Sequence, residues 1–164
     1  MREILFRGKC KDTGKWYEGY YVHLHKTTYC FKEDYDRNPD NDMHQIIFEE
    51  MMDWGLPNRH FRVDVIPETV GQYTGLTDKN GKKIFEGDIV KNDWCFMCGN
   101  SVIKFGQYKP LDMGNEYQQG HLGFYLEHIH KADKRSVRKD IMYFANNCEV
   151  IGNIHDNPEL LKGE

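Results

Sequence analysis

Apolar residues in this chain recur mainly in short runs that alternate with polar residues, and turn-forming residues separate the runs. Alternation with a period of two predicts strands, because successive side chains of a strand point to opposite faces. The runs that we expect to form strands lie at residues 3–9, 16–24, 27–31, 61–65, 102–108, 122–129, 141–145 and 149–154. A helical period is scarce, so the pattern predicts a mainly β fold with little helix.

Two stretches between these runs differ from the rest. Residues 32–42 are polar, contain Pro39 and lack any period, so we expect a mobile loop. In residues 43–54 the apolar positions fit one face of a helix, while Ile46–Phe48 alone would fit a strand. The pattern leaves both alternatives open for this second stretch.

Pro67 marks the expected boundary between two parts of the chain. In residues 1–66, the first two runs flank a turn and predict an antiparallel β-hairpin subdomain. Residues 67–164 contain the later, closely spaced strands and are expected to form the main domain.

The segment from Val70 to Val90 carries the strongest turn signals. Asparagine followed by glycine predicts a hairpin turn, because both residue types tolerate positive φ. An aspartate two residues before this pair can accept hydrogen bonds from the turn's backbone N–H groups. A second Gly-Asp corner follows, whose glycine is expected at positive φ and whose aspartate is expected to cap the backbone rather than act with Glu86 as an acid–base pair. The residues assigned as structural turns are Asp78, Asn80, Gly81, Gly87 and Asp88.

Four sequence blocks, in order, carry a resemblance to a known family. They are Met1–Lys9 with Trp16 and Tyr17; Val70–Leu76 with Asp78–Gly81; Ile84–Val90; and Cys148–Ile154 with Asn157–Leu161. The chain resembles the YopX family, whose members are encoded mainly by bacteriophages and prophages. The resemblance implies an SH3-type β-barrel, a small roll, in residues 67–164 with an N-terminal β-hairpin extension. It implies no biochemical activity.

The length of 164 residues suits one ordinary domain or two small ones. No apolar run is long enough to span a membrane, and Met1 leads directly into an alternating run without a signal segment. The five cysteines are an odd number, which argues against a disulfide framework. We therefore expect a protein of the cytoplasm of the host bacterial cell, with no membrane partner.

Charge is unevenly distributed around a net value of −4. Residues 33–53 contain eight acids and one base, Arg37, while residues 131–139 contain five bases and one acid, Asp133. Such opposed patches can attract a partner of opposite charge, including another copy of the same chain. The overall acidity argues against a dedicated nucleic-acid-binding protein.

Candidate metal ligands are few. Cys95 and Cys98 have the spacing of half a zinc site, but the sequence contains no second such pair. The other ligands would have to be histidines or a lone cysteine, such as His128, His130 or Cys148. Histidines alternate at His23/His25 and His128/His130, and either pair could present both rings on one face of a strand. We expect free thiols and solvent-exposed imidazoles, with no metal and no cofactor.

Motifs for nucleotide binding, zinc proteolysis or serine hydrolysis do not occur in the sequence. We therefore expect no enzyme activity. The leading hypothesis is a phage or prophage accessory protein that binds a host or phage protein, or assembles with itself, without catalysis. One alternative is nucleic-acid binding by Lys104, Tyr108 and Lys109 with the basic run at 131–139. The other, less favoured, is a metal-dependent enzyme that joins Cys95 and Cys98 to histidines.

Overall fold

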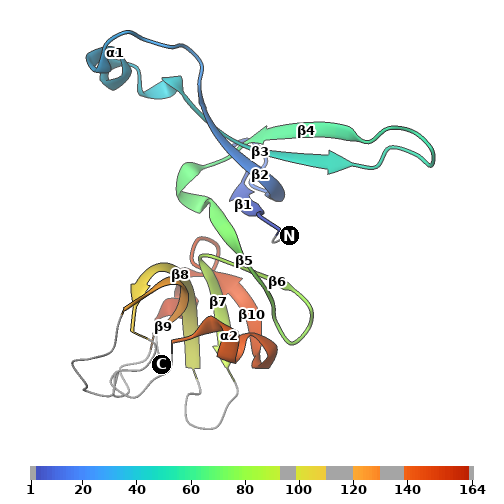
Figure 1. Cartoon of the computed structure of the whole chain (residues 1–164), viewed down its shortest axis with the longest axis vertical. Helices are drawn as coiled ribbons and strands as arrows, with labels where there is room; N and C mark the ends of the chain where they lie inside the picture. Colours follow the sequence, from blue (N-terminus) through green and yellow to red (C-terminus); the bar gives the residue numbers. More distant parts are fainter. Residues whose placement is uncertain (1–2, 93–98, 110–119, 130–138, 163–164) are drawn as a thin grey trace. The chain divides into compact units, whose positions relative to one another are not determined.

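The structure is a computed structural model that describes residues 3–92, 99–109, 120–129 and 139–162. The chain divides into two compact units, residues 3–72 and 73–164. The division lies within strand β5 (Gly71–Thr77), a few residues after the boundary that the sequence places at Pro67. Both units are built from antiparallel strands, so the prediction of a mainly β fold is confirmed (Figure 1). No helix among the described residues is long and apolar enough to cross a membrane.

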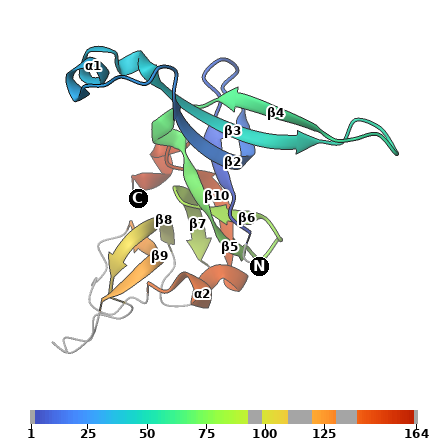
Figure 2. The same ribbon diagram turned by 45° about the horizontal axis from the view of Figure 1, so that its top comes forward.

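The first unit is one twisted antiparallel sheet with strand order β4-β3-β2-β1-β5 (Figures 1 and 2). Its elements are β1 (Phe6–Lys9), β2 (Trp16–His25), helix α1 (Lys32–Arg37), the 3-10 turn η1 (Pro39–Asn41), β3 (Asp42–Glu50), β4 (Arg59–Asp64) and the 3-10 turn η2 (Pro67–Thr69). The hairpin predicted from the first two runs is confirmed, because β1 pairs antiparallel with β2. Residues Gly71 and Gln72 at the start of β5 pair with the other edge of β1.

Close backbone approach fixes the centre of this sheet. Gly19 of β2 lies so near β3 that a Cβ atom there would be 2.2 Å from the carbonyl oxygen of Ile47. The neighbouring Ile46 is fully buried, as is Val65, which follows β4. A glycine in this position therefore permits the strands to approach and the apolar side chains to pack.

Residues 26–42 differ from the sequence prediction. The run at 27–31 is not a strand, because its backbone bonds side chains instead: the N–H of Thr27 donates to the Asn41 amide, and the N–H of Tyr29 donates to the Tyr35 hydroxyl. The stretch 32–42, expected as a loop, contains α1 and η1. Acidic residues in the first turn of α1 and Arg37 in its last turn complement the partial charges of the helix ends. For residues 43–54 the strand alternative is right, since most of the stretch lies in β3.

The second unit contains a four-stranded antiparallel sheet with order β10-β7-β8-β9, while β6 pairs with the remainder of β5. The bounds are β6 (Lys83–Phe85), β7 (Asp88–Asn92), β8 (Gly99–Tyr108), β9 (His121–His128), helix α2 (Ile141–Phe144), the 3-10 turns η3 (Ala145–Asn147) and η4 (Pro158–Leu161), and β10 (Cys148–Asn153). One apolar core holds this unit together; its fully buried members include Ile84, Val90, Ile103, Leu126 and Cys148.

The run at 141–145 was expected to be a strand and is not. Ile141 begins the short helix α2, and Ile141 and Ala145 both point into the core. Two apolar residues four apart lie on one face of a helix, so the same residues satisfy a helical as well as an alternating pattern. The prediction of a strand here was therefore wrong.

The expected closed barrel is also corrected. Within the described ranges the strands form two antiparallel sheets, and the outer strands β9 and β10 do not pair with each other. Each outer strand instead bonds a neighbouring segment. The N–H of Leu126 on β9 donates to the carbonyl of Lys139, and the carbonyl of Cys148 on β10 accepts from Lys79. These contacts cover the two edges that barrel closure would otherwise join.

Candidate functional site

The turn around Asn80 and Gly81 is organised by one buried carboxylate. Asp78 accepts backbone hydrogen bonds from Asn80 at 2.8 Å and from Lys82 at 2.9 Å through Oδ1. Its Oδ2 accepts a third bond, at 3.0 Å, from Val150 of β10. Gly81 has φ of +81°, the positive value that the turn signal predicts. The role of Asp78 is therefore structural, and it extends from the turn to a distant strand.

The second corner has the same character. Gly87 has φ of +82°, and its N–H donates to the carbonyl of Ile103 at 2.9 Å. Asp88 is fully buried, and its Oδ2 accepts the N–H of Phe85 at 2.8 Å. This hydrogen bond ties the Asp88 carboxylate to the backbone of the corner.

A two-stranded arm forms the first surface that could bind a partner. Pairing of β2 with β3 ends at Tyr20 and Ile47, whereas pairing of β3 with β4 continues to Glu50 and Arg59. Beyond Ile47 the chain is therefore a hairpin, which extends outward from the sheet of its own unit (Figures 1 and 2). We call residues 48–61 the β3–β4 arm.

The tip of the β3–β4 arm is apolar and exposed. Trp54 is 95% exposed and lies beside Gly55, whose φ of +79° turns the chain back. The other large apolar side chains exposed at the tip are Met51, Met52 and Leu56. Single exposed apolar residues are ordinary on a protein surface, but here four of six successive residues are large and apolar, interrupted only by Asp53 and Gly55. The sequence analysis weighed this stretch only as helix or strand and did not single out these residues as a surface.

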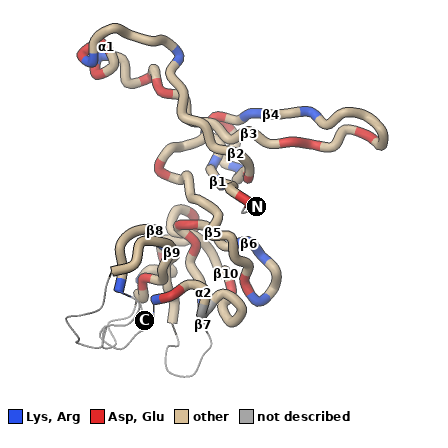
Figure 3. The backbone as a smooth tube through the Cα atoms, viewed as in Figure 1, with Lys and Arg blue, Asp and Glu red and all other residues tan. Residues whose placement is uncertain are grey.

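The acidic residues counted in the sequence lie mainly on α1 and along β3 (Figure 3). Three of them belong to the β3–β4 arm: Asp53 at its tip, and Glu49 and Glu50 on β3. On β4, His60 and Arg59 face the two glutamates. The arm thus carries both signs of charge beside its apolar tip. The opposed basic run, from Lys131 to Arg138, lies outside the residues that the structure describes.

The second notable surface is a group of titratable side chains on β2 and β3. His23 lies directly opposite His44, and His25 lies directly opposite Asp42. Residues two apart on a strand share a face, so the four side chains occupy the corners of a square on one face of the sheet. We call this group the histidine–carboxylate square.

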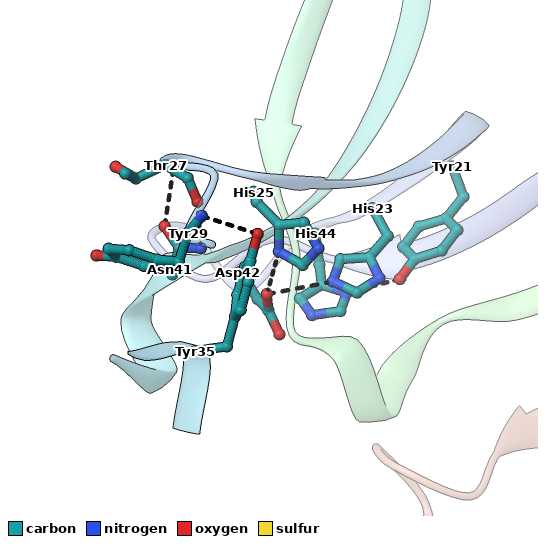
Figure 4. A network of polar contacts seen from close by, with 9 residues as sticks. All are labelled: Tyr21, His23, His25, Thr27, Tyr29, Tyr35, Asn41, Asp42 and His44. Carbon is teal, nitrogen blue, oxygen red and sulfur yellow. Dashed lines mark hydrogen bonds and ion pairs between the residues drawn. The ribbon is translucent and has the colours of Figure 1, made fainter. Parts of the chain in front are cut away.

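Contacts within the histidine–carboxylate square are short (Figure 4). The Nδ1 of His25 donates to Asp42 Oδ1 at 2.7 Å, and His23 Nε2 lies 3.6 Å from the same oxygen. The His23 and His44 rings stack with 4.4 Å between their centroids. Tyr21 joins the group through a hydrogen bond of 2.6 Å between its hydroxyl and His44 Nδ1. The donor atoms of His23, Asp42 and His44 all lie within 4.8 Å of one another.

Local electrostatics favour the metal-binding protonation states of two members. The hydrogen bond from His25, with the nearby His23, lowers the pKa of Asp42, so that its carboxylate is ionised. Partial burial and the neighbouring His23 lower the pKa of His44, so that its imidazole is neutral near pH 7. Burial raises the pKa of Tyr21, which remains a phenol able to donate or accept.

The candidate metal ligands named from the sequence do not come together in one site among the described residues. Cys95, Cys98 and His130 lie in segments outside the described ranges. His128 is joined to the Ser101 hydroxyl by a hydrogen bond of 2.8 Å in the second unit. Cys148 is buried, and burial raises the pKa of its thiol to about 11. Among the described residues, His23 and His25 lie beside two further potential ligands, Asp42 and His44, which the sequence analysis did not single out.

Two members of the suggested nucleic-acid surface, Lys104 and Tyr108, contact other residues of the second unit. Lys104 forms an ion pair with Glu127 on the adjacent strand. Tyr108 stacks on Tyr125, and its hydroxyl donates to Asp140 at 3.3 Å.

Comparisons with known proteins identify a family and similar solved structures. The model of the family described as YopX protein matches residues 5–162 of the chain. No curated protein matches the chain significantly. A solved structure described as protein EF1440 from Enterococcus faecalis is similar at 20% sequence identity and a TM-score of 0.44, covering 99% of this chain and all of the other.

Proposed function

The chain belongs to the YopX family, and we propose that this member is a non-enzymatic, protein-binding accessory protein of a phage or prophage, which acts in the cytoplasm of the bacterial host. The part of the molecule that we assign to binding is the β3–β4 arm. Its partner in this proposal is a second copy of the chain.

The exposed apolar tip of the arm carries the proposal. Trp54 exposes nearly all of its surface, and burial of apolar area contributes about 25 cal/mol per Å² removed from water. Tryptophan is also enriched among the residues that dominate binding energy at interfaces. Met51, Met52 and Leu56 extend the same apolar segment. Contact with a protein surface would remove all four side chains from water.

Charge on the arm favours a second copy as the partner. A two-fold symmetric dimer uses the same surface on both subunits, so that surface must complement itself. The arm carries the acids Glu49, Glu50 and Asp53 together with the base Arg59, and Arg62 follows directly after it on β4. Two such surfaces placed antiparallel can match acids with bases around a shared apolar centre.

We also infer that the second unit is a relative of SH3-type small barrels that remains open. Four short antiparallel strands in the order β10-β7-β8-β9, with tight glycine corners at Gly81 and Gly87, support this inference. The buried carboxylates of this unit, Asp78 and Asp88, accept backbone hydrogen bonds, which is a structural role. We therefore propose no reaction for the protein.

Multi-angle light scattering over a range of concentrations tests the proposal. The unaltered chain is expected to show a dimer that dissociates on dilution, whereas Trp54→Ala is expected to remain monomeric at the same concentrations. Leu122→Ala is the matched control. Like Trp54, Leu122 is a large, exposed apolar residue, but it lies on β9 in the second unit. This control should dimerise as the unaltered chain does.

One result would overturn the proposed partner, and another would overturn the arm as the binding surface. A chain that is monomeric at every concentration would overturn self-association, and capture of a host protein that depends on Trp54 would then identify a different partner for the same arm. Equal dimerisation of Trp54→Ala and the unaltered chain would show that the arm is not the contact surface.

A further inference from the structure

The histidine–carboxylate square has the composition and the placement of a metal site. We propose that it binds a divalent transition cation of the zinc class, with His23, His44 and Asp42 as the protein ligands. The proposal is independent of the function assigned to the β3–β4 arm. It also departs from the sequence expectation, which favoured simple exposure of His23 and His25.

Register is the first argument. His23 and His44 are cross-strand partners, and Asp42 precedes His44 by two residues on the same face of β3. The ladder therefore fixes the three Cβ positions, and the side chains alone must adjust. Their donor atoms lie within 4.8 Å of one another. Around a tetrahedral zinc, with bonds of about 2.0–2.1 Å, donor atoms are about 3.4 Å apart, a distance that rotation of exposed side chains can reach.

Neighbouring side chains form hydrogen bonds that orient two of the proposed ligands, as is usual at metal sites. Ligating histidines commonly donate their second ring N–H to an oxygen, and ligating carboxylates accept a further hydrogen bond. The Tyr21 hydroxyl lies 2.6 Å from His44 Nδ1 and can accept that N–H, which leaves Nε2 for the cation. His25 donates to Asp42 at 2.7 Å (Figure 4). Tyr21 and His25 are thus positioning residues for the proposed site.

Ligand type selects the class of cation. Two imidazoles with one carboxylate suit zinc, cobalt, nickel or copper, whereas magnesium and calcium prefer oxygen ligands alone. Three protein ligands leave a fourth position for water or another ligand, as in open zinc sites. The side chains of His23 and Asp42 are each 44% exposed, so the cation and this fourth ligand can reach the site from solvent.

A neighbouring pair provides the contrast. His60 and Glu49 are also directly opposite each other, on β4 and β3, and their nearest nitrogen and oxygen atoms are 3.5 Å apart. This pair is not part of a group of three donors among the described residues. If exposed cross-strand histidine–carboxylate pairs bound metal in general, His60 would contribute to affinity as much as His44.

The test is titration of the full-length chain with zinc chloride by calorimetry, in the Cys95→Ser/Cys98→Ser background. That background is needed because two thiolates at this spacing can bind zinc themselves. One zinc per chain is expected. His44→Ala should weaken binding by about 100-fold or more, Tyr21→Phe by about 10-fold as outer-sphere partners do, and His60→Ala should leave the affinity unchanged.

Cobalt in place of zinc supplies a second readout in the chain with its natural cysteines. Nitrogen and oxygen ligation gives visible absorption bands without a sulfur-to-metal charge-transfer band, and shifted imidazole resonances of His23 and His44 in a nitrogen NMR spectrum would identify the ligands. These spectra are obtained on the unaltered chain, so they decide the matter even where His44→Ala fails to fold.

The proposal is overturned by absence of zinc binding in the Cys95→Ser/Cys98→Ser background or by equal affinity of a folded His44→Ala variant. Cobalt bound only with a charge-transfer band would assign the metal to Cys95 and Cys98 instead. If His60→Ala lowered the zinc affinity as much as His44→Ala does, zinc binding at the square would be adventitious binding to surface histidines.

Discussion

Asp78 shows how much of this fold can depend on one side chain. Its two oxygens accept three backbone hydrogen bonds, of which two lie in the turn and one comes from β10. The side chain is nearly inaccessible to solvent. The sequence predicted the local bonds, because an aspartate two residues before Asn-Gly forms such turns. The bond to Val150 could not be predicted, since it depends on a strand 72 residues away.

Replacement of Asp78 by asparagine is expected to lower the free energy of unfolding by about 1–3 kcal/mol. An amide has one acceptor oxygen, so at least one buried N–H loses its partner and faces an NH₂ group. Chemical denaturation at pH 7 measures this difference. Asp156→Asn is the control, because Asp156 is an exposed aspartate, and its replacement should change stability little.

The same residue predicts a pH dependence. Burial alone would raise the pKa of Asp78, but the N–H donors of Val150, Lys82 and Asn80 outweigh it and hold the pKa below 3.8. Between the folded and the unfolded pKa the unfolded state binds more protons, so this contribution is present above about pH 4 and is lost as the pH falls further. Asp78→Asn should therefore lose less stability between pH 4 and pH 2 than the unaltered chain. An identical acid profile for the two chains would contradict this role.

At the scale of elements, the sequence predicted strands that pair with a neighbour in the chain better than features that depend on more distant pairing. The hairpin of β1 and β2 is local, and its alternating pattern was sufficient to predict it. Helices α1 and α2 were missed because short helices contain too few residues for a helical period to stand out. The histidine–carboxylate square was also out of reach. It requires the register of β2 against β3, which the intervening residues 26–41 set through structure that the sequence did not reveal.

Close approach of β2 and β3 at Gly19 gives a prediction at this scale. A methyl group there would lie 2.2 Å from the Ile47 carbonyl oxygen, so Gly19→Ala must push the strands apart. We expect a loss of about 1–3 kcal/mol in stability and faster hydrogen exchange along β2 and β3. Gly123→Ala on β9 is the matched control, because nothing lies within 4 Å of its added Cβ. Equal losses of stability in both variants would mean that the close contact between β2 and β3 at Gly19 is not the cause of the loss.

For the molecule as a whole, sequence reasoning recovered the fold class and the family but not the closure of the sheets. Alternating runs indicate strands without stating which edges meet. The described edges of β9 and β10 are instead bonded by segments near Lys139 and Lys79. The apolar tip of the β3–β4 arm was missed for a related reason: exposure of residues 51–56 follows from their place at the end of a two-stranded ribbon.

The net charge of the whole molecule favours a protein partner over a nucleic-acid partner. The chain carries −4, and Lys104, the described lysine at the centre of β8, is paired with Glu127. Phosphate binding requires unpaired cations and weakens steeply with salt. We therefore expect fluorescence anisotropy to show no binding of single-stranded DNA near 150 mM salt, and weak binding only at low salt. Glu127→Gln should strengthen this low-salt binding, because it releases Lys104 from its ion pair. Glu149→Gln is the control for the change in net charge, because it removes the same charge from the ion pair between Glu149 and Lys79. Tight binding at physiological salt would favour a nucleic-acid partner over the protein contact proposed for the arm.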